Sequence, residues 1–402
     1  MMRYLLAFGF TLALCVGHAQ PTIGLVAYYS FDNCDATDDT GNGADGVISG
    51  APGCGCGVSG NALEFDGGSD FIQFLGNFDL LFSEDFTLSF YIQSLNTSGI
   101  VDIISKKDGC TADSSITVRF EPSSRSVRAE LTQNINLMAE SRVNISPEQC
   151  WHHVAWVRSA GNLIIYYDGV PVEVTPLGQA INASNNGIFS IANSPCLANG
   201  ELRFAGSLDE LRLYNRALTT GEIAELYLPI DEIGSRDTVL FLGNSVQIDL
   251  PNSCASAFSW SPAQGVVAFT DREPVITPNM TTTYEVTMEY GFCTATDTIR
   301  LIVVDSTQLN CESVFLPNAF TPNGDGLNDD FGLSNAFFLG DFGSLQIYDR
   351  WGTLLFEAFN PDIMWDGSYE SEPLMPGTYI YKLRYRCGGE DYIKTGSVNL
   401  IK

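Results

Sequence analysis

Short stretches in which apolar and polar residues alternate recur along the 402-residue chain. Two of them are FTLSFYIQS at 86–94 and TTTYEVTMEYGFC at 281–293. A period of two residues places the apolar side chains on one face of a β-strand, where a sandwich can bury them. Because long helical periodicity is missing and the strands are short and closely spaced, the pattern predicts all-β domains.

Two local patterns predict how strands are joined and where a helix forms. YYDGVPV at 166–172 places Asp168 and Gly169 between apolar residues, which is typical of a tight hairpin turn. TTGEIAELY at 219–227 places a threonine at a helix cap position ahead of Glu222, and this predicts one short helix.

Length, composition and charge bound the class of protein. At ~150 residues per domain the chain is expected to hold two to four domains, and its apolar content of 45% is enough for real cores. The net charge of −28 leaves no basic face for phosphate contacts, so we exclude a nucleic-acid partner held in that way. An acidic surface suits solubility and divalent cations.

The first 19 residues have the features of a signal peptide. Arg3 supplies the positive charge, residues 5–16 form the apolar stretch, and small residues precede a predicted cut after Ala19. A lipoprotein cut before Cys15 is the rival, but the residue in front of it is large for that position. No other apolar run is long enough to span a membrane, so we expect an exported protein without a transmembrane segment.

The cysteines indicate disulfides. Eleven occur, and removal of the signal peptide leaves ten, an even number. In an exported chain this favours disulfides over metal or redox sites. Cys54 and Cys56 are separated by one residue, whereas zinc and redox pairs usually have two. The cysteines of residues 20–228 allow many connectivities, which their spacing leaves open.

Four strings spread over residues 20–228 suggest a known family for this segment. They are LVAYYSFD with the DDTGNG loop that follows it, ALEFDGGSDFIQF, WHHVAWV and LDELRLYNRALT. Together they resemble the laminin-G-like, concanavalin-A-like jelly-roll domains. The resemblance implies a jelly-roll sandwich, and the family includes sugar binders, adhesion modules and domains that accompany enzymes.

The acidic loop DNCDATDDTGNG at 32–43 is a candidate calcium site. Calcium takes six to eight oxygen ligands, often carboxylates from separate segments together with backbone carbonyls. The jelly-roll resemblance implies that this loop and the last strand lie side by side around a structural calcium ion. It assigns the ligands to Asp38, to the turn at Gly41 and Asn42, and to Asp209. The alternative is a solvated acidic loop that only turns the chain.

Residues 229–308 are expected to form a second, smaller β-sandwich. Cys254, Trp260 and Cys293 follow the Cys, Trp, Cys order of immunoglobulin domains. The segment resembles the immunoglobulin- or PKD-like modules of bacterial surface proteins, which usually act as spacers. The sandwich pattern predicts a disulfide between Cys254 and Cys293.

Residues 311–402 are expected to form a third domain, again a β-sandwich. The strings FLPNAFTPNGDGLNDDF, LQIYDRWGTLLFE, WDGSYESEPLMPGTYIYKLRYRC and GSVNLIK follow one another in this segment. They resemble the gliding-motility-associated C-terminal domain of exported Bacteroidetes proteins. The resemblance implies sorting by the type IX secretion machinery, followed by display at the cell surface or release. A disulfide between Cys311 and Cys387 would tie the first strand of this domain to a late one.

These observations favour a binding or adhesion protein that holds a glycan or a surface protein through its jelly roll. The binding surface is expected at loops of one sandwich end or on a concave sheet face. A structural surface or matrix component and a polysaccharide-degrading enzyme are the alternatives. A jelly-roll glycosidase needs two carboxylates across the sugar, and no E-x-D-x-E, G-x-S-x-G or H-E-x-x-H pattern occurs. We therefore predict that the protein is not an enzyme.

Overall fold

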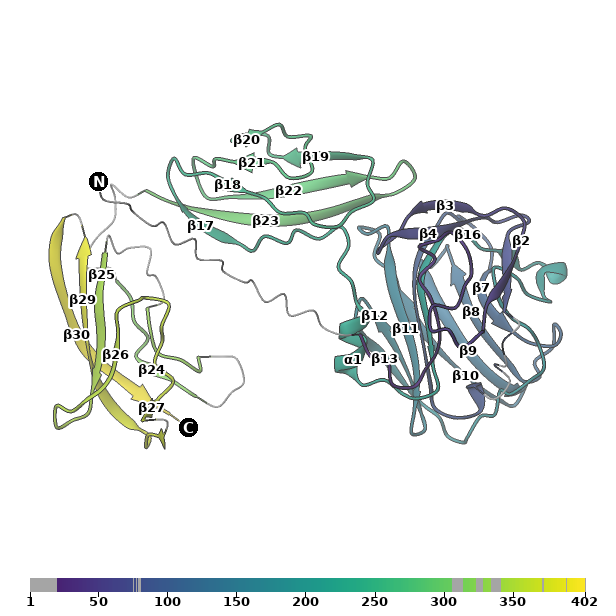
Figure 1. The fold of residues 1–402 in the computed structure, drawn as a ribbon, viewed down its shortest axis with the longest axis horizontal. Helices are drawn as coiled ribbons and strands as arrows, with labels where there is room; N and C mark the ends of the chain where they lie inside the picture. The colour runs from purple at the N-terminus through teal and green to yellow at the C-terminus, as the bar shows by residue number, and fades with distance from the viewer. Residues whose placement is uncertain are drawn as a thin grey trace, which may run out of the picture.

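The computed structural model describes residues 20–401 apart from 75, 77, 79–80, 306–313, 323–327, 334–340, 371 and 388. Its regular structure is almost entirely β-strand, as the alternating pattern predicts, and Figure 1 shows three β-domains in chain order. The predicted signal peptide lies outside the described residues. Within those residues, no helix has the length and apolar character needed to cross a membrane.

The first domain is a jelly-roll-like sandwich of two sheets with eight strands each. In sheet A the strands pair in the order β13-β12-β11-β6-β16-β4-β3, and β1 pairs with the part of β16 beyond β4. The strands of sheet A are β1 (Leu25–Tyr29), β3 (Gly53–Cys56), β4 (Asn61–Asp66), β6 (Phe86–Ser94), β11 (His152–Ser159), β12 (Asn162–Tyr167), β13 (Val170–Pro176) and β16 (Ala205–Tyr214).

Sheet B faces sheet A across the core. Its strands pair in the order β10-β9-β8-β7-β14-β5-β2, and β15 runs parallel to β7. The strands of sheet B are β2 (Gly46–Ser49), β5 (Phe71–Phe74), β7 (Val101–Lys106), β8 (Ser115–Glu121), β9 (Ser126–Asn134), β10 (Leu137–Asn144), β14 (Phe189–Ile191) and β15 (Leu202–Arg203). Two 3-10 helices lie in connections of this domain, η1 (Leu81–Ser83) between β5 and β6 and η2 (Leu197–Asn199) between β14 and β15.

Alternate residues of each strand build the core between the sheets. Phe86 and Leu88 of β6 point into it, whereas Thr87 and Ser89 point to the other face of sheet A and are buried as well. That second face is covered by helix α1 (Thr220–Leu226), which packs its apolar side against the sheet. Because both faces of β6 are covered, every residue of the strand except Ser94 at its end is buried, although its sequence alternates.

Both local predictions are confirmed. Asp168 and Gly169 have φ angles of 47° and 78°, which is the positive φ that a two-residue hairpin turn between β12 and β13 requires. At the start of α1, the Thr219 hydroxyl accepts a hydrogen bond from the Glu222 amide at 3.3 Å. The Glu222 carboxylate accepts one from the Thr219 amide at 2.8 Å, which completes a capping box.

The middle domain packs a four-stranded sheet, β17-β23-β22-β19, beside a three-stranded sheet, β18-β21-β20. Trp260 is buried in its core, and its indole Nε1 donates a hydrogen bond to the Asp271 carbonyl at 3.0 Å. The strands are β17 (Thr238–Phe241), β18 (Val246–Gln247), β19 (Ala257–Ser261), β20 (Val266–Val267), β21 (Val275–Ile276), β22 (Thr282–Glu289) and β23 (Thr294–Val304).

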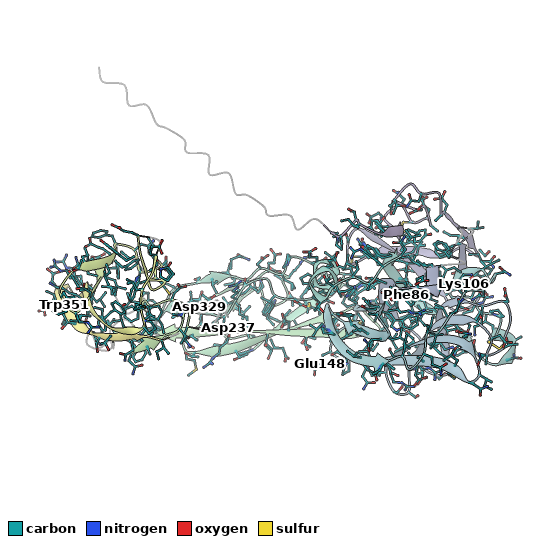
Figure 2. All side chains as sticks on the ribbon, turned by 90° about the horizontal axis from the view of Figure 1, so that it is seen from below. Phe86, Lys106, Glu148, Asp237, Asp329 and Trp351 are labelled. Atoms are coloured by element: carbon teal, nitrogen blue, oxygen red, sulfur yellow. A yellow bond between two sulfur atoms is a disulfide. The ribbon has the colours of Figure 1, made fainter. Side chains whose placement is uncertain are left out.

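The C-terminal domain is built on a five-stranded sheet, β24-β30-β29-β25-β26, with a separate hairpin of β27 and β28. Trp365 and Phe331 are fully buried in its core, while Trp351 at the β25–β26 turn is 85% exposed and projects at the far end of the molecule in Figure 2. The strands are β24 (Ala319–Phe320), β25 (Asp341–Tyr348), β26 (Leu354–Ala358), β27 (Ser368–Tyr369), β28 (Glu372–Pro373), β29 (Gly377–Cys387) and β30 (Glu390–Leu400).

Two disulfides join the first domain to the middle domain. Cys56 of β3 is bonded to Cys254, and Cys150, two residues before β11, is bonded to Cys293. The predicted Cys254–Cys293 pair is therefore wrong. Cys254 precedes β19 and Cys293 lies in the β22–β23 turn, so both lie outside the paired strands of the middle sandwich and reach the first domain instead.

Two further disulfides lie within the first domain, Cys34–Cys54 and Cys110–Cys196. Cys387 in the C-terminal domain is disulfide-bonded as well. Its expected partner, Cys311, lies outside the described residues, so that pairing stays a prediction.

Non-covalent contacts also hold the first and middle domains together. The Asn252 side chain of the middle domain donates from Nδ2 to the Val58 carbonyl of the first domain at 2.7 Å. Asp231, in the connection that enters the middle domain, is buried, and its carboxylate accepts hydrogen bonds from the Tyr290 hydroxyl at 2.7 and 2.8 Å. The Thr296 amide donates to the Glu148 carbonyl at 3.1 Å, and Figure 2 places Glu148 where the two domains meet. The two domains thus share a buried, covalently closed junction.

Candidate ligand-binding site

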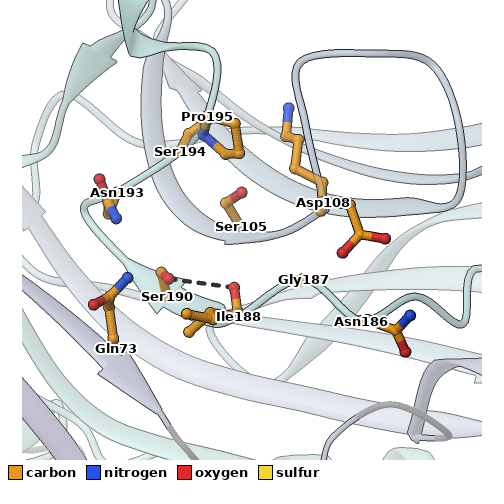
Figure 3. A pocket seen from close by; sticks show the side chains of 11 residues that line it. Gln73, Ser105, Asp108, Asn186, Gly187, Ile188, Ser190, Asn193, Ser194 and Pro195 are labelled. Carbon is orange, nitrogen blue, oxygen red and sulfur yellow. Dashed lines mark hydrogen bonds between the residues drawn. The ribbon is translucent and has the colours of Figure 1, made fainter.

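A polar hollow of about 510 Å³ opens on the face of sheet B that points away from the core. Its floor is a row of three side chains on adjacent strands, Gln73 of β5, Ser190 of β14 and Ser105 of β7 (Figure 3). The strand register places Ser190 directly opposite both of the others. Because strand residues alternate between faces, the neighbouring Ile72, Ile191 and Ile104 are buried in the core.

Three loop segments form the walls of the hollow. They are residues 107–108 after β7, residues 186–188 before β14 and residues 193–195 after β14. The first two walls touch at Gly187, where an added Cβ would lie only 2.2 Å from the Lys107 carbonyl carbon. Only glycine fits this approach, and Lys106 Nζ holds the same segment by donating to the Gly187 carbonyl at 2.7 Å.

A disulfide connects the walls on the other side. Cys110, in the loop after β7, is bonded to Cys196, in the loop after β14. Lys107 is buried, and its Nζ donates to Cys196 Sγ at 3.3 Å. The Cys196 amide in turn donates to Ser194 Oγ at 3.1 Å. The loop walls of the hollow are therefore held in place before any ligand binds, which lowers the entropic cost of binding.

Two acidic side chains lie behind this wall. Arg119 bridges them, with its Nε 3.2 Å from Asp102 Oδ1 and an Nη 2.8 Å from Glu201 Oε1. Burial, and then the hydrogen bond to Glu201, raise the pKa of Asp102 to about 7. Burial opposes ionisation of Glu201 too, but its bond to Asp102 and the charges of Arg119 and Lys107 outweigh burial and lower its pKa. Asp102 therefore stays protonated in mildly acidic solution and loses its proton as the pH rises through about 7.

Most of the groups that line the hollow are uncharged and polar, namely the amides of Gln73, Asn186 and Asn193 and several serine hydroxyls. The lining also holds two charged residues, Asp108 with its carboxylate and the buried Lys107, whose Nζ is engaged with Cys196 Sγ. Neither member of the buried acidic pair lines it. A glycosidase flanks the scissile bond with two carboxyl groups. The described lining supplies one.

Asp38, the first of the predicted calcium ligands, organises its own loop. Its Oδ1 accepts hydrogen bonds from the Tyr28 amide at 3.2 Å and from the Thr40 hydroxyl at 2.7 Å, and its Oδ2 accepts one from the Ala44 amide at 3.3 Å. The Asn42 side chain donates to the Val26 carbonyl at 3.0 Å. These bonds are those of a turn in which polar side chains satisfy the backbone.

Asp209 lies in a different network. Its Oδ2 accepts from the amides of Val58 and Ser59 at 2.8 and 3.3 Å, and its Oδ1 accepts from the Glu210 amide at 2.9 Å. Across the described part of the chain, no group of three or more His, Cys, Asp or Glu residues is placed to hold a metal ion. Asp38 and Asp209 share no hydrogen-bond partner among the described residues. The calcium site, including the Gly41 turn, stays a prediction.

The hollow was not predicted from the sequence. Its floor comes from three strands between residues 71 and 191. Only β5 belongs to a string that carries the family resemblance, and that string pointed to the fold and not to a binding residue. The one local signal was the pair Cys110 and Cys196, whose linkage the spacing could not settle.

Family models identify two of the three domains. Residues 66–224 match the concanavalin A-like lectin/glucanases superfamily, and residues 314–400 match the CHU_C type IX secretion signal domain. The chain thus carries a lectin- or glucanase-like sandwich and a type IX secretion signal domain, as the two resemblances predict. The signal domain makes it a secreted or cell-surface protein.

Among solved structures, domain 4 of AbnA, an extracellular arabinanase from Geobacillus stearothermophilus, shares 22% identity at a TM-score of 0.41 and covers 50% of this chain and 98% of its own. The binding domain of botulinum neurotoxin DC, in complex with rat synaptotagmin II, shares 11% identity at a TM-score of 0.44 and covers 94% of this chain and 95% of its own. A sialidase CBM40 from Ruminococcus gnavus shares 13% identity at a TM-score of 0.33, and the match covers 37% of this chain and 84% of the CBM40 chain. At this level of similarity their ligands do not carry over. No curated protein matches the chain.

Proposed function

We propose that this protein is an exported, non-catalytic binding protein that holds a glycan in the polar hollow on sheet B. The observation that carries the proposal is a preformed row of amides and hydroxyls on a sandwich of the lectin and glucanase superfamily. The type IX secretion signal domain delivers the site to the outside of the cell, where glycans occur.

The composition of the hollow supports a sugar ligand. Each sugar hydroxyl both donates and accepts, and the amide and serine side chains do the same. Asn193 Oδ1 already accepts from Arg203 Nη1 at 2.9 Å, which leaves its Nδ2 to donate. The volume of about 510 Å³ lies within the roughly 300–1,000 Å³ of small-molecule sites.

The test is a glycan array on the secreted chain, followed by calorimetric titration of each positive glycan. Gln73→Leu keeps the size of the side chain and removes its hydrogen bonds. At about 0.5–1.5 kcal/mol per neutral hydrogen bond, we expect affinity to fall up to about tenfold. Gln179→Leu makes the same change on an exposed loop outside the hollow and should bind like the wild type.

Two results would count against the proposal. If wild type and Gln73→Leu bind every positive glycan with equal affinity, the glycan does not bind in the polar hollow. A chain that binds no glycan would favour the alternatives, a protein ligand at the cell surface or a structural role in the matrix.

A further inference from the structure

A second concave site lies where the first domain meets the middle domain. It has a volume of about 380 Å³ and lies before the start of β7, whereas the polar hollow adjoins the end of that strand. Three segments of the first domain and one turn of the middle domain line this interdomain cleft, namely 94–97, 120–125, 145–152 and 292–293. Domain interfaces are preferred places for ligand sites.

The shape of the cleft is fixed by a disulfide and by hydrogen bonds between the segments that form it. The Cys150–Cys293 disulfide fixes the tip of the β22–β23 hairpin on the first domain. Tyr290, on the same hairpin, donates to the buried Asp231, and its amide donates to the Cys293 carbonyl at 3.1 Å. The turn residue between them, Phe292, is therefore held at the rim with its side chain 52% exposed.

His152 supplies a hydrogen-bond acceptor at the wall of the cleft. Its side chain is 3% exposed, and its Nδ1 lies 3.0 Å from the Tyr167 hydroxyl. Tyr167 donates its single hydrogen to Gln149 Oε1 at 2.7 Å, so His152 Nδ1 must be the donor in that contact. The other ring nitrogen, Nε2, then carries the lone pair, and within the described residues it has no hydrogen-bond partner.

Burial and the nearby charge of Arg125 hold the pKa of His152 at about 3, so the imidazole is neutral at any ordinary pH. Arg125 itself is exposed at the same cleft and uses one Nη to donate to the Ser146 carbonyl at 2.9 Å. Its remaining N–H groups are donors for a ligand. An acceptor and a donor thus stand together beside a half-exposed aromatic ring.

We propose that the interdomain cleft binds a neutral sugar ring. The apolar face of the ring packs on Phe292, and one hydroxyl donates to His152 Nε2 while its oxygen accepts from Arg125. A hydroxyl satisfies both groups at once, whereas a carboxylate would oppose the lone pair of His152. The inference rests on the proposed glycan binding and adds a contact site that the middle domain completes.

The test uses the Phe292→Trp variant of the full chain and neutral oligosaccharides that bind on the glycan array. The introduced indole reports occupancy of the cleft, because no tryptophan lines either site. We expect a saturable change in its emission. We also expect binding to weaken by about two- to tenfold in Phe292→Ala, from the loss of a ring contact of about 0.5–1.5 kcal/mol. Phe269→Ala is the matched control, since Phe269 is 50% exposed elsewhere in the middle domain.

The outcomes separate the two sites. Unchanged emission together with unchanged affinity in Phe292→Ala overturns the cleft, and loss of affinity in Gln73→Leu then leaves the hollow standing. A saturable emission change in the Phe292→Trp/Gln73→Leu double variant supports the cleft, and it overturns the hollow if Gln73→Leu also leaves the affinity for every positive glycan unchanged. Equal loss of affinity in Phe269→Ala and Phe292→Ala overturns the cleft, because the effect is then a general one.

Discussion

Replacing both Cys150 and Cys293 with alanine removes one of the two covalent links between the first and middle domains. The disulfide closes a loop of 143 residues, and the chain-entropy relation gives such a loop ~5 kcal/mol of stabilisation at 25 °C. The Cys34–Cys54 disulfide closes a loop of 20 residues, for which the same relation gives ~3 kcal/mol. The interdomain pair should therefore contribute ~2 kcal/mol more.

The assay is differential scanning calorimetry of the full chain and of the two double-alanine variants. At ~2–4 °C per kcal/mol for a unit of this size, the interdomain variant should melt ~4–8 °C below the Cys34→Ala/Cys54→Ala variant. Its transition should also broaden or split, because the domains lose part of their covalent coupling. Equal melting temperatures for the two variants would refute the reasoning. A peptide map of the unreduced protein that links Cys254 to Cys293 would refute the pairing itself.

Three further predictions follow from the geometry. Gly187→Ala forces the hollow walls apart, so it should cost about 1–3 kcal/mol in chemical denaturation and weaken glycan binding, whereas Gly178→Ala, in open space, should do neither. Folding raises the pKa of Asp102 from 3.8 to about 7, so the protonated side chain adds to the free energy of unfolding in full below pH 3.8, and this contribution is lost as the pH rises through about 7. The melting temperature should therefore fall between these pH values, and Asp102→Asn should make that fall smaller. If calcium binds at Asp38 and Asp209, millimolar calcium should raise the melting temperature, and a chelator should reverse the increase. Identical melting curves with calcium and with chelator would show that calcium does not bind there.

Much of the fold follows from the sequence because its signals are local. Alternation sets which face of a strand is buried, and it predicted all-β domains without reference to any distant residue. The turn at Asp168 and Gly169 and the capping box of Thr219 and Glu222 each depend on residues within a few positions of one another. Their energetics are decided by backbone conformation and neighbouring hydrogen bonds, which a short window of sequence contains.

The partners in the disulfides could not be predicted from the sequence, because they depend on which surfaces of the first and middle domains pack together. The order of Cys254, Trp260 and Cys293 is that of an immunoglobulin sandwich, and Trp260 does take the expected core position. The cysteines lie just outside the strands, however, and each bonds a residue of the first domain more than 140 positions away. Only the docking of the two domains decides that choice.

The sequence by itself determined the strand pattern, the helix cap, the tight turn and the two family resemblances. Only the tertiary structure decided the candidate sites. Gln73, Ser105 and Ser190 form one row because β5, β14 and β7 pair in a particular register. Phe292 and His152 line one cleft because a disulfide joins the two domains beside it. Register and docking are set by the burial of whole faces, so the information is spread over many residues and no short motif records it.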